Sequence, residues 1–320
     1  MSRYQPKKSL ALFFREAYGA PCLDYPLFGE EGTDTYEAFV LRAGGQDYYR
    51  SKMRDEMLTS LVAEYTDVAI QKSRPAVLYL NGEYWGIHFI REKVNEHYVA
   101  ANYNADADTV IIAEGNGTSC KQYQELVQYA ASHKLSKQEN YEHICTMMDV
   151  EEYMDYIIAE ICMGNYDNDN IKFFTYGGGK WTWLLYDTDL SLGSAGFNSV
   201  EAHLNPNGTG ASDWVSTVII NALLKNDTFK DQFLKRMAWQ LNTIWSPETL
   251  NAKIDEMVSM IEPDMARECQ KWDIIDYSTW QRYITKMRNV SNARAANLIY
   301  YIKDYFKLST AEMRQYGFSI

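Results

Sequence analysis

Cysteine is scarce in this chain of 320 residues, and its placement excludes the usual roles of cysteine clusters. The five cysteines are scattered, odd in number and without any C-x-x-C pair. A zinc ribbon needs such pairs and a disulfide framework needs an even, regularly spaced set, so the sequence predicts neither. Four of the five histidines show no metal-ligand spacing, and the fifth, His88, is expected to pack within a strand.

The chain also lacks long apolar runs and has fewer basic than acidic residues. No hydrophobic segment approaches the length of a membrane span, and the start, MSRYQPKKSL, lacks the pattern of a signal peptide. The chain is therefore expected to be cytosolic, or to have a targeting segment outside this sequence. A net charge of −12 argues against a nucleic-acid phosphate backbone as partner and is compatible with a cation, a nucleotide–metal complex or a basic protein substrate.

The first hundred residues predict strands, one helix and a hairpin. With 46% hydrophobic residues, the chain can bury a core as one large domain or as two lobes. Alternating apolar residues indicate strands over 9–14 and 37–42. Apolar residues at helical spacing predict one amphipathic helix over 48–65. The run 75–90, with the turn pair Asn81-Gly82 inside it, is typical of a β-hairpin.

The remainder is predicted to be mainly helical. Asp149 has the position of a helix N-cap with Glu152 as its reciprocal partner, and the apolar face that follows ends at Gly164. Further amphipathic helices, interrupted by Pro247 and Pro263, are expected over 213–242, 248–272 and 279–306.

The most informative segment is N-Y-D-N-D-N at 165–170, which follows the end of that first helix. Two β-rich runs, 171–176 and 180–186, come next and are joined by three glycines, which predicts an antiparallel hairpin that ends in Y-D-T-D. If the hairpin folds at the middle glycine, Asn170 lies opposite Tyr186 and Asp167 opposite Asp189. Directly opposed residues approach to about 4.5–5.5 Å, so Asp187 joins these side chains in one small volume.

Carboxylates that close repel one another unless they are protonated or bridged by a cation, and Mg²⁺ with nucleotide phosphates would resolve the conflict. An Asx-rich turn that caps the preceding helix explains Asn165, Asp167, Asp169 and Asn170 equally well from spacing alone. An EF-hand is disfavoured, because residues 171 and 172 are Ile and Lys where a ligand and a glycine belong. A glycosidase carboxylate pair is conceivable but leaves Asn170 without a role.

The order of these parts along the chain is that of a protein kinase. Kinases run from a strand lysine, through a helix with a glutamate and a hinge, to a helical part, a catalytic loop with Asp and Asn, and a strand that ends in a metal-binding Asp. The Asp-to-Asn interval here is shorter than in D-x-x-x-x-N, and no G-x-G-x-x-G is visible, so any kinase would be atypical. The corresponding parts are Lys7 or Lys8, Asp55 or Glu56, the segment 90–93, Asp167 with Asn170, and Asp187.

Several segments closely resemble the spore coat protein H (CotH) kinase family. Together they are specific, and the similarity covers nearly the whole chain. The segments are PKKSL (6–10), LRAGGQDYYRSKMRDEM (41–57), RPAVLYLNGEYWGIHFIREKV (74–94), EEYMDYIIAEICMGNYDNDN (151–170), KWTWLLYDTDLSLG (180–193) and LLKNDTFKDQFLKRMAWQL (223–241). The Arg-Gly-Asn-Ser-like segment that usually precedes the PKKS strand in the family is not in this sequence.

The resemblance implies an α+β, atypical protein-kinase-like fold with two lobes. A nucleotide-binding, mixed β/α N-lobe is expected over 1–100. A mainly helical C-lobe is expected over 101–320, with the catalytic loop and metal-binding hairpin at 165–190. The implied activity is transfer of the ATP γ-phosphate to serine of basic, Ser-rich, spore-coat-like proteins, with Mg²⁺ or Mn²⁺ as the metal. The family also suggests a spore-surface or extracellular location.

The resemblance also implies roles for particular residues. Asp167 is expected to orient or deprotonate the substrate hydroxyl, Asp187 with Asp189 to bind metal, and Asn170 to bind a second metal or brace the loop. The expected nucleotide contacts are Lys8, Arg54, Glu56 and Glu92. The alternative function is a non-catalytic surface, adhesion or cellulosome-associated module that keeps the fold, and a carbohydrate-active hydrolase is a third class.

Overall fold

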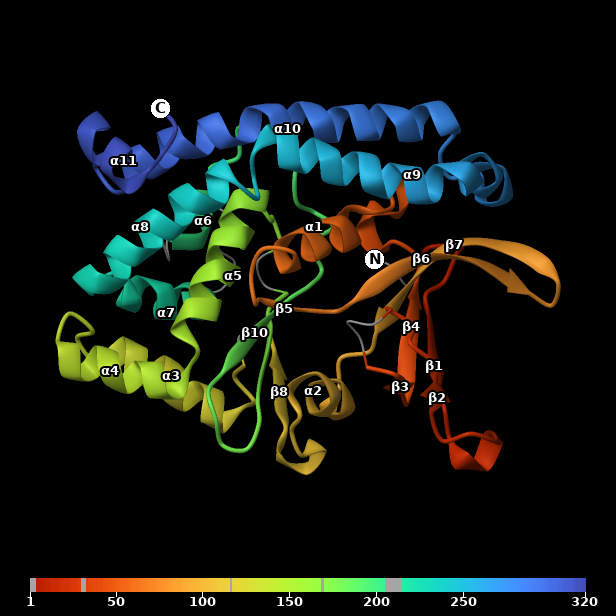
Figure 1. The fold of residues 1–320 in the computed structure, drawn as a ribbon, viewed down its shortest axis with the longest axis horizontal. Helices are drawn as coiled ribbons and strands as arrows, with labels where there is room; N and C mark the ends of the chain where they lie inside the picture. Colours follow the sequence, from red (N-terminus) through yellow and green to blue (C-terminus); the bar gives the residue numbers. More distant parts are fainter. Residues whose placement is uncertain (1–3, 30–32, 116, 168–169, 205–213) are drawn as a thin grey trace.

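The computed structural model describes residues 4–29, 33–115, 117–167, 170–204 and 214–320, and the side chains of 214–216 are left aside. The chain is a mixed α+β structure with a β-rich N-terminal region, as Figure 1 shows. The strands are β1 (Leu10–Phe13), β2 (Leu23–Asp24), β3 (Thr35–Tyr36), β4 (Ala38–Arg42), β5 (Ala69–Ile70), β6 (Ser73–Leu80), β7 (Glu83–Glu92), β8 (Ile111–Glu114), β9 (Lys172–Thr175) and β10 (Thr182–Leu185).

Helices make up most of the rest, and short 3₁₀ segments lie at Glu16–Tyr18, Gly45–Tyr49 and Ala107–Thr109. The helices are α1 (Arg54–Ala63), α2 (Glu96–Tyr103), α3 (Lys121–Ser132), α4 (Gln138–Met147), α5 (Val150–Met163), α6 (Ser199–Leu204), α7 (Trp214–Leu223), α8 (Asp227–Asn242), α9 (Pro247–Trp272), α10 (Tyr277–Tyr305) and α11 (Thr310–Tyr316). None of the helices in the described part of the chain combines the length and hydrophobicity of a membrane-spanning helix.

The first sheet is antiparallel and has the strand order β1-β4-β7-β6. The strands predicted near 9–14 and 37–42 are confirmed as β1 and β4, and the hairpin predicted over 75–90 is confirmed as β6 and β7. Asn81 and Gly82 both have positive φ, 51° and 82°, which a tight turn between paired strands requires. In this sheet, β4 ends at Arg42 directly beside β7.

Helix α1 differs from its prediction in both extent and environment. It begins at Arg54 rather than near residue 48, because Gly45–Tyr49 forms a 3₁₀ segment. The carboxylate of Asp47 accepts hydrogen bonds from the backbone N–H groups of Ser51 and Arg54 and so closes the loop before the helix. The helix is not amphipathic, because it lies between the first sheet and α9 and its charged first turn is buried (Figure 1).

Helix α5 carries the chain to the acidic segment. The predicted N-cap is confirmed, since Asp149 Oδ1 accepts a hydrogen bond from the N–H of Glu152 at 3.1 Å. The reciprocal role expected of Glu152 is wrong: its Oε2 instead accepts a hydrogen bond from the backbone N–H of Trp183 at 3.2 Å. The helix ends as expected at Gly164, which has φ of 64° and allows the left-handed turn of a C-cap.

The predicted hairpin is confirmed with its register. Strands β9 and β10 pair antiparallel, with Thr182 opposite Phe174 and Trp183 opposite Phe173, which places the fold-back point at Gly178. Strand β8 pairs with β9, and the short β5 runs parallel to β10 on the other edge. This second sheet is buried on both faces, because Phe173 packs in the main core and Phe174 packs against α2.

The C-terminal helices depart from their predicted boundaries at two places. The segment expected as one helix over 213–242 is two helices, α7 and α8, and Asn226 caps the second by accepting the N–H of Phe229. Pro247 is the first residue of α9, but Pro263 lies inside that helix without ending it. The proline removes one backbone hydrogen bond, and the long packing of α9 against α10 and the β6–β7 hairpin outweighs that loss (Figure 1).

Candidate active site

A polar cavity lies where the loop after α5 meets the ends of β4 and β7, the turn after β10 and the start of α1. Its volume is about 470 Å³, within the range of small-molecule sites. Charged and amide side chains from all of these segments converge on it. They include Arg42, Asp55, Arg91, Asn170, Asp187 and Asp189.

The loop after α5 and the turn after β10 meet through one amide side chain. Asn170 Nδ2 donates hydrogen bonds to Asp167 Oδ2 and to Asp187 Oδ2, each at 2.9 Å. The N–H of Asp167 in turn donates to Asn165 Oδ1 at 3.1 Å, which holds the loop in an Asx turn. The Asx-turn and clustered-carboxylate interpretations of the sequence therefore both describe this loop. Asp169 lies outside the described residues.

The turn Asp187–Asp189 is fixed by hydrogen bonds from distant segments. Asp187 has a left-handed φ of 58°, which aspartate tolerates better than most residues. The backbone N–H of Thr188 donates to Asp55 Oδ1 at 2.9 Å. The N–H of Gln46 donates to Asp189 Oδ2 at 2.6 Å. The loop after β4 and the first turn of α1 thus set the position of both aspartates.

Two arginines that the sequence analysis did not single out lie among these carboxylates. The guanidinium of Arg42 is 2.9 Å from Asp55 Oδ2 and 3.1 Å from one carboxylate oxygen each of Asp187 and Asp189. Arg91 Nη1 donates to Asp55 Oδ2 at 2.6 Å. The only sequence signal was an arginine near the end of each of two otherwise apolar strands, and that signal does not show that the strands are neighbours.

The buried carboxylates have shifted pKa values in opposite directions. Burial alone would raise the pKa of Asp55, but Arg91 and Arg42 hold it well below its usual range. Burial raises the pKa of Asp189 to about 7 despite the opposing charge of Arg42, and it also raises the pKa of Asp187. The two arginines therefore do not neutralise the whole cluster, and an added cation would stabilise it.

The donor set suits a hard cation. Asp189 Oδ1 is buried and has no hydrogen-bond partner among the described residues, and Asp187 and Asn170 offer further oxygen atoms nearby. Mg²⁺ is usually held by one or two carboxylates together with water and phosphate oxygens. No three His, Cys, Asp or Glu side chains converge into a complete metal cage in the described part of the chain. The guanidinium of Arg42 contacts both Asp187 and Asp189.

The two N-terminal lysines have different environments. Lys7 is buried, and its Nζ is 2.5 Å from both Glu268 Oε1 on α9 and the carbonyl oxygen of Ile87. Lys8 is exposed, and its carbonyl oxygen lies 3.2 Å from His88 Nε2. Neither lysine lines the cavity, whereas the next residue, Ser9, does.

The other predicted nucleotide contacts also lie outside the cavity wall. Arg54 is buried behind the turn, where Nη1 donates to the carbonyl oxygen of Asp189 at 3.4 Å. Glu56 Oε1 is 3.4 Å from Arg42 and so contacts the site through that arginine. Glu92 points to another part of the fold, where it accepts hydrogen bonds from the N–H of Lys72 and from Asn102.

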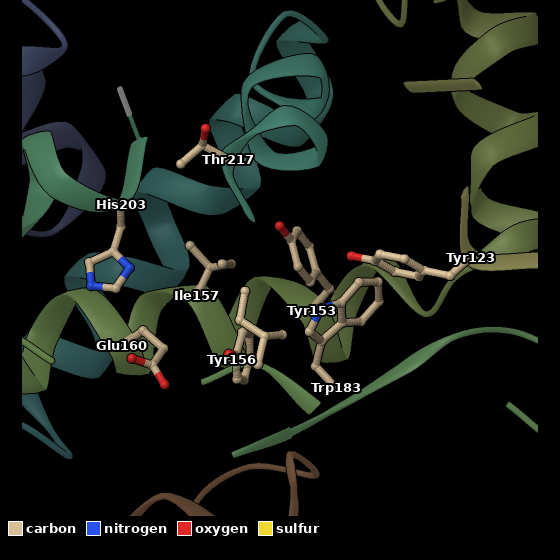
Figure 2. Close-up of a pocket in the computed structure, with 9 residues that line it drawn as sticks. Tyr123, Tyr153, Tyr156, Ile157, Glu160, Trp183, His203 and Thr217 are labelled. Carbon is tan, nitrogen blue, oxygen red and sulfur yellow. The ribbon is translucent and has the colours of Figure 1, made fainter. Parts of the chain in front are cut away.

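A second, water-sized cavity of about 20 Å³ lies beside α5, and Figure 2 shows Tyr153, Tyr156 and Glu160 of that helix among its lining residues. Glu160 lines it, is fully enclosed, and has a pKa raised by burial to about 8 against the opposing hydrogen bond of Asn165. His203 lines the same cavity, and its Nε2 lies 3.3 Å from the carbonyl oxygen of Asn165. Glu160 and His203 thus both hold Asn165, the residue whose side chain orients Asp167.

Comparison with known proteins gives a match at the level of a protein family. No curated protein sequence gives a significant match to the chain. The family described as CotH kinase protein matches residues 1–298, which is nearly the whole sequence. That span includes both four-stranded sheets and every residue of the polar cavity. The chain therefore belongs to the CotH kinase protein family.

Proposed function

We propose that this protein is an atypical, two-lobed Ser/Thr protein kinase that transfers the γ-phosphate of ATP to serine in a basic, Ser-rich protein. The observation that carries the proposal is the position of Asn170 between Asp167 and Asp187 at the edge of a charged cavity of about 470 Å³. Family membership makes a kinase-like activity the expected one. In the proposed division, residues 1–100 form the nucleotide-binding lobe and 101–320 form the helical lobe.

The residues around Arg42 are proposed to hold the nucleotide and metal. Asp187 and Asp189 would bind Mg²⁺ or Mn²⁺ with Asn170 beside them, and the metal would offset the negative charge of the phosphates. Arg42 and Arg91 line the cavity and are proposed as the main phosphate contacts, a role the family resemblance assigned to Lys8. Glu56 would support Arg42 in the way that the helix glutamate of a kinase supports the strand lysine.

Asp167 is proposed to bind and orient the serine hydroxyl. Its carboxylate is held by Asn170, and its backbone N–H by Asn165, so its position does not depend on the substrate. A carboxylate held in this way can accept the hydroxyl proton as the oxygen attacks phosphorus. Positioning and charge neutralisation would supply most of the rate enhancement.

A basic substrate is proposed from the charge of the chain. The net charge of −12 favours association with segments rich in lysine and arginine. Added salt screens such attraction, so phosphorylation of a basic Ser-rich peptide should weaken as ionic strength rises. A rate that does not depend on salt would remove this part of the proposal.

The experiment is a labelling assay with ATP and Mg²⁺, using a Ser/Lys-rich peptide and three variants. Wild-type protein should transfer label, Asp167→Ala and Asp187→Ala should lose it, and Asp304→Ala, an exposed aspartate on α10, should keep it. Equal labelling by all four proteins would contradict the assigned roles. Absence of both labelling and an ATP-dependent thermal shift in the wild type would favour a non-catalytic module instead.

A further inference from the structure

A second large groove lies at the opposite end of α5 from the candidate active site. Its volume is about 550 Å³, and it runs between α5 and α8 beside the residues that precede β5. Helix α5 has 14 residues and is about 21 Å long, and the groove is lined by residues from its start as far as Asp155, so the groove lies about 12–21 Å from the loop that carries Asp167. The residues that matter to its chemistry are Asp67, Asp149, Glu151, Glu152, Arg236 and Trp239.

The groove carries an excess of negative charge. Asp67, Asp149 and Glu151 form no ion pair with any residue that the structure describes. The two cationic residues of the groove are already paired: Arg236 donates two hydrogen bonds of 2.6 Å to Asp155, and Lys235 lies 2.7 Å from Asp231. The groove therefore attracts a cation and repels an anionic ligand.

One buried carboxyl group of the groove has an oxygen atom without a hydrogen-bond partner. Glu152 is 9% exposed, and its Oε2 accepts the N–H of Trp183. Its other oxygen, Oε1, is buried without a hydrogen-bond partner among the described residues. Buried polar atoms are nearly always paired, so this oxygen is an observation separate from the surface charges, and it favours a ligand that forms hydrogen bonds.

An aromatic edge completes the groove. Trp239 is 37% exposed, and the guanidinium of Arg236 lies 4.5 Å from its ring centroid. Exposed tryptophan contacts both the aliphatic stem and the charged head of lysine and arginine side chains. Acidic groups beside an aromatic surface, in a space of this volume, suit a side chain of that kind better than a bare metal ion, for which the described residues form no cage.

We infer that this groove binds a lysine- or arginine-bearing segment of a partner polypeptide. The inference concerns binding and does not require phosphate transfer. If the partner is also the phosphate acceptor, which rests on the proposed function, its basic segment lies about four or more residues from the serine. That is the number of extended residues needed to span about 12 Å, the distance from Asp155 to the end of α5.

The test measures fluorescence anisotropy of a labelled 12-residue Lys/Arg–Gly peptide with the full chain, without nucleotide. The groove variant carries Asp67→Asn and Glu151→Gln, which neutralise two exposed side chains and keep their shapes. The control variant carries Glu125→Gln and Asp304→Asn, which change the net charge equally on α3 and α10. The groove variant should bind about fivefold to thirtyfold more weakly than wild type, and the control within about twofold.

Three outcomes would overturn the inference. These are no binding by the wild type, equal weakening in groove and control variants, and equal binding of a Glu–Gly peptide of the same length. Trp239→Ala serves as an independent second variant and should also weaken binding. Because no nucleotide is present, a failure of the proposed kinase activity leaves this result unaffected, and a failure here leaves the labelling assay unaffected.

Discussion

Replacing Gly45 with alanine is expected to displace the charged side chains of the candidate site without preventing folding. Gly45 has φ of 54° in the loop after β4. A Cβ atom at this position would lie 2.2 Å from Asp189 Oδ2 and 2.5 Å from Arg42 Nη2, and both distances are far below van der Waals contact. Both atoms are at the ends of flexible side chains, so the side chains rather than the backbone should move.

The size of the effect has two parts. A left-handed alanine costs about 1–2 kcal/mol relative to glycine. Disturbing the charged hydrogen bonds around Asp189 costs a further 1.5–3 kcal/mol or so. Each kcal/mol lowers the melting temperature of a chain of this size by about 2 °C, so Gly45→Ala should melt about 5–10 °C below wild type.

Gly177→Ala is the matched control for the cost of placing alanine in a left-handed backbone conformation. Gly177 has φ of 57°, nearly the same as Gly45, and an added Cβ there has no atom within 4 Å. This variant should melt only about 2–4 °C below wild type. Differential scanning fluorimetry measures both variants, with and without ATP and Mg²⁺. Gly45→Ala should also lose any thermal shift that the nucleotide produces in the wild type, whereas Gly177→Ala should keep it.

The refuting result is a Gly45→Ala protein that melts within about 1 °C of Gly177→Ala. That result would mean that the side chains of Arg42 and Asp189 do not lie against Gly45, and the geometry of the site would be wrong. The comparison does not depend on the proposed function, because it holds without nucleotide. A normal nucleotide shift in Gly45→Ala would separately contradict the assignment of the site.

Three further predictions concern buried charges. Asp55→Ala leaves the N–H of Thr188 and two arginines without their shared partner, so it should cost about 3–5 kcal/mol in urea unfolding, and a loss below about 1 kcal/mol would contradict this. Burial raises the pKa of Glu160 from 4.5 to about 8, so the folded chain keeps a proton that the unfolded chain releases and stability falls as pH rises through that range. Glu160→Gln should flatten this slope by up to about 1.4 kcal/mol per pH unit, whereas an identical slope in both proteins would exclude Glu160 as its source. Lys7→Met removes a charged hydrogen bond to Glu268 and should lower the free energy of unfolding by about 1.5–3 kcal/mol. An unchanged melting temperature would contradict this and show that the hydrogen bond from Lys52 is enough to stabilise the buried Glu268 carboxylate.

Local parts of the fold were predictable because their signals lie close together in the chain. The β9–β10 register followed from the position of Gly178, and the ends of α5 followed from Asp149 and Gly164. The contact of Asn170 with Asp187 was predictable for the same reason, since a short hairpin separates them. Turn geometry and helix capping depend on only a few neighbouring residues, and they favour particular residue types at those positions.

Boundaries and environments that depend on packing were not predictable. The charges at the start of α1 suggested a solvated face, but the helix is buried between a sheet and α9. Pro263 suggested a helix end, but packing along α10 maintains α9 through it. A sequence pattern shows how polar a residue is and does not show which distant charge will neutralise it.

The sequence by itself determined the family, the hairpin and the grouping of Asp167, Asn170, Asp187 and Asp189, because these depend on motifs and on contacts within 25 residues. Only the tertiary structure decided that Arg42 and Arg91 both pair with Asp55 beside this group and that Lys7 pairs with Glu268. Those partners are separated by up to 261 residues. A buried charge is stable only beside its partner, and which partner that is depends on how sheets and helices pack in three dimensions.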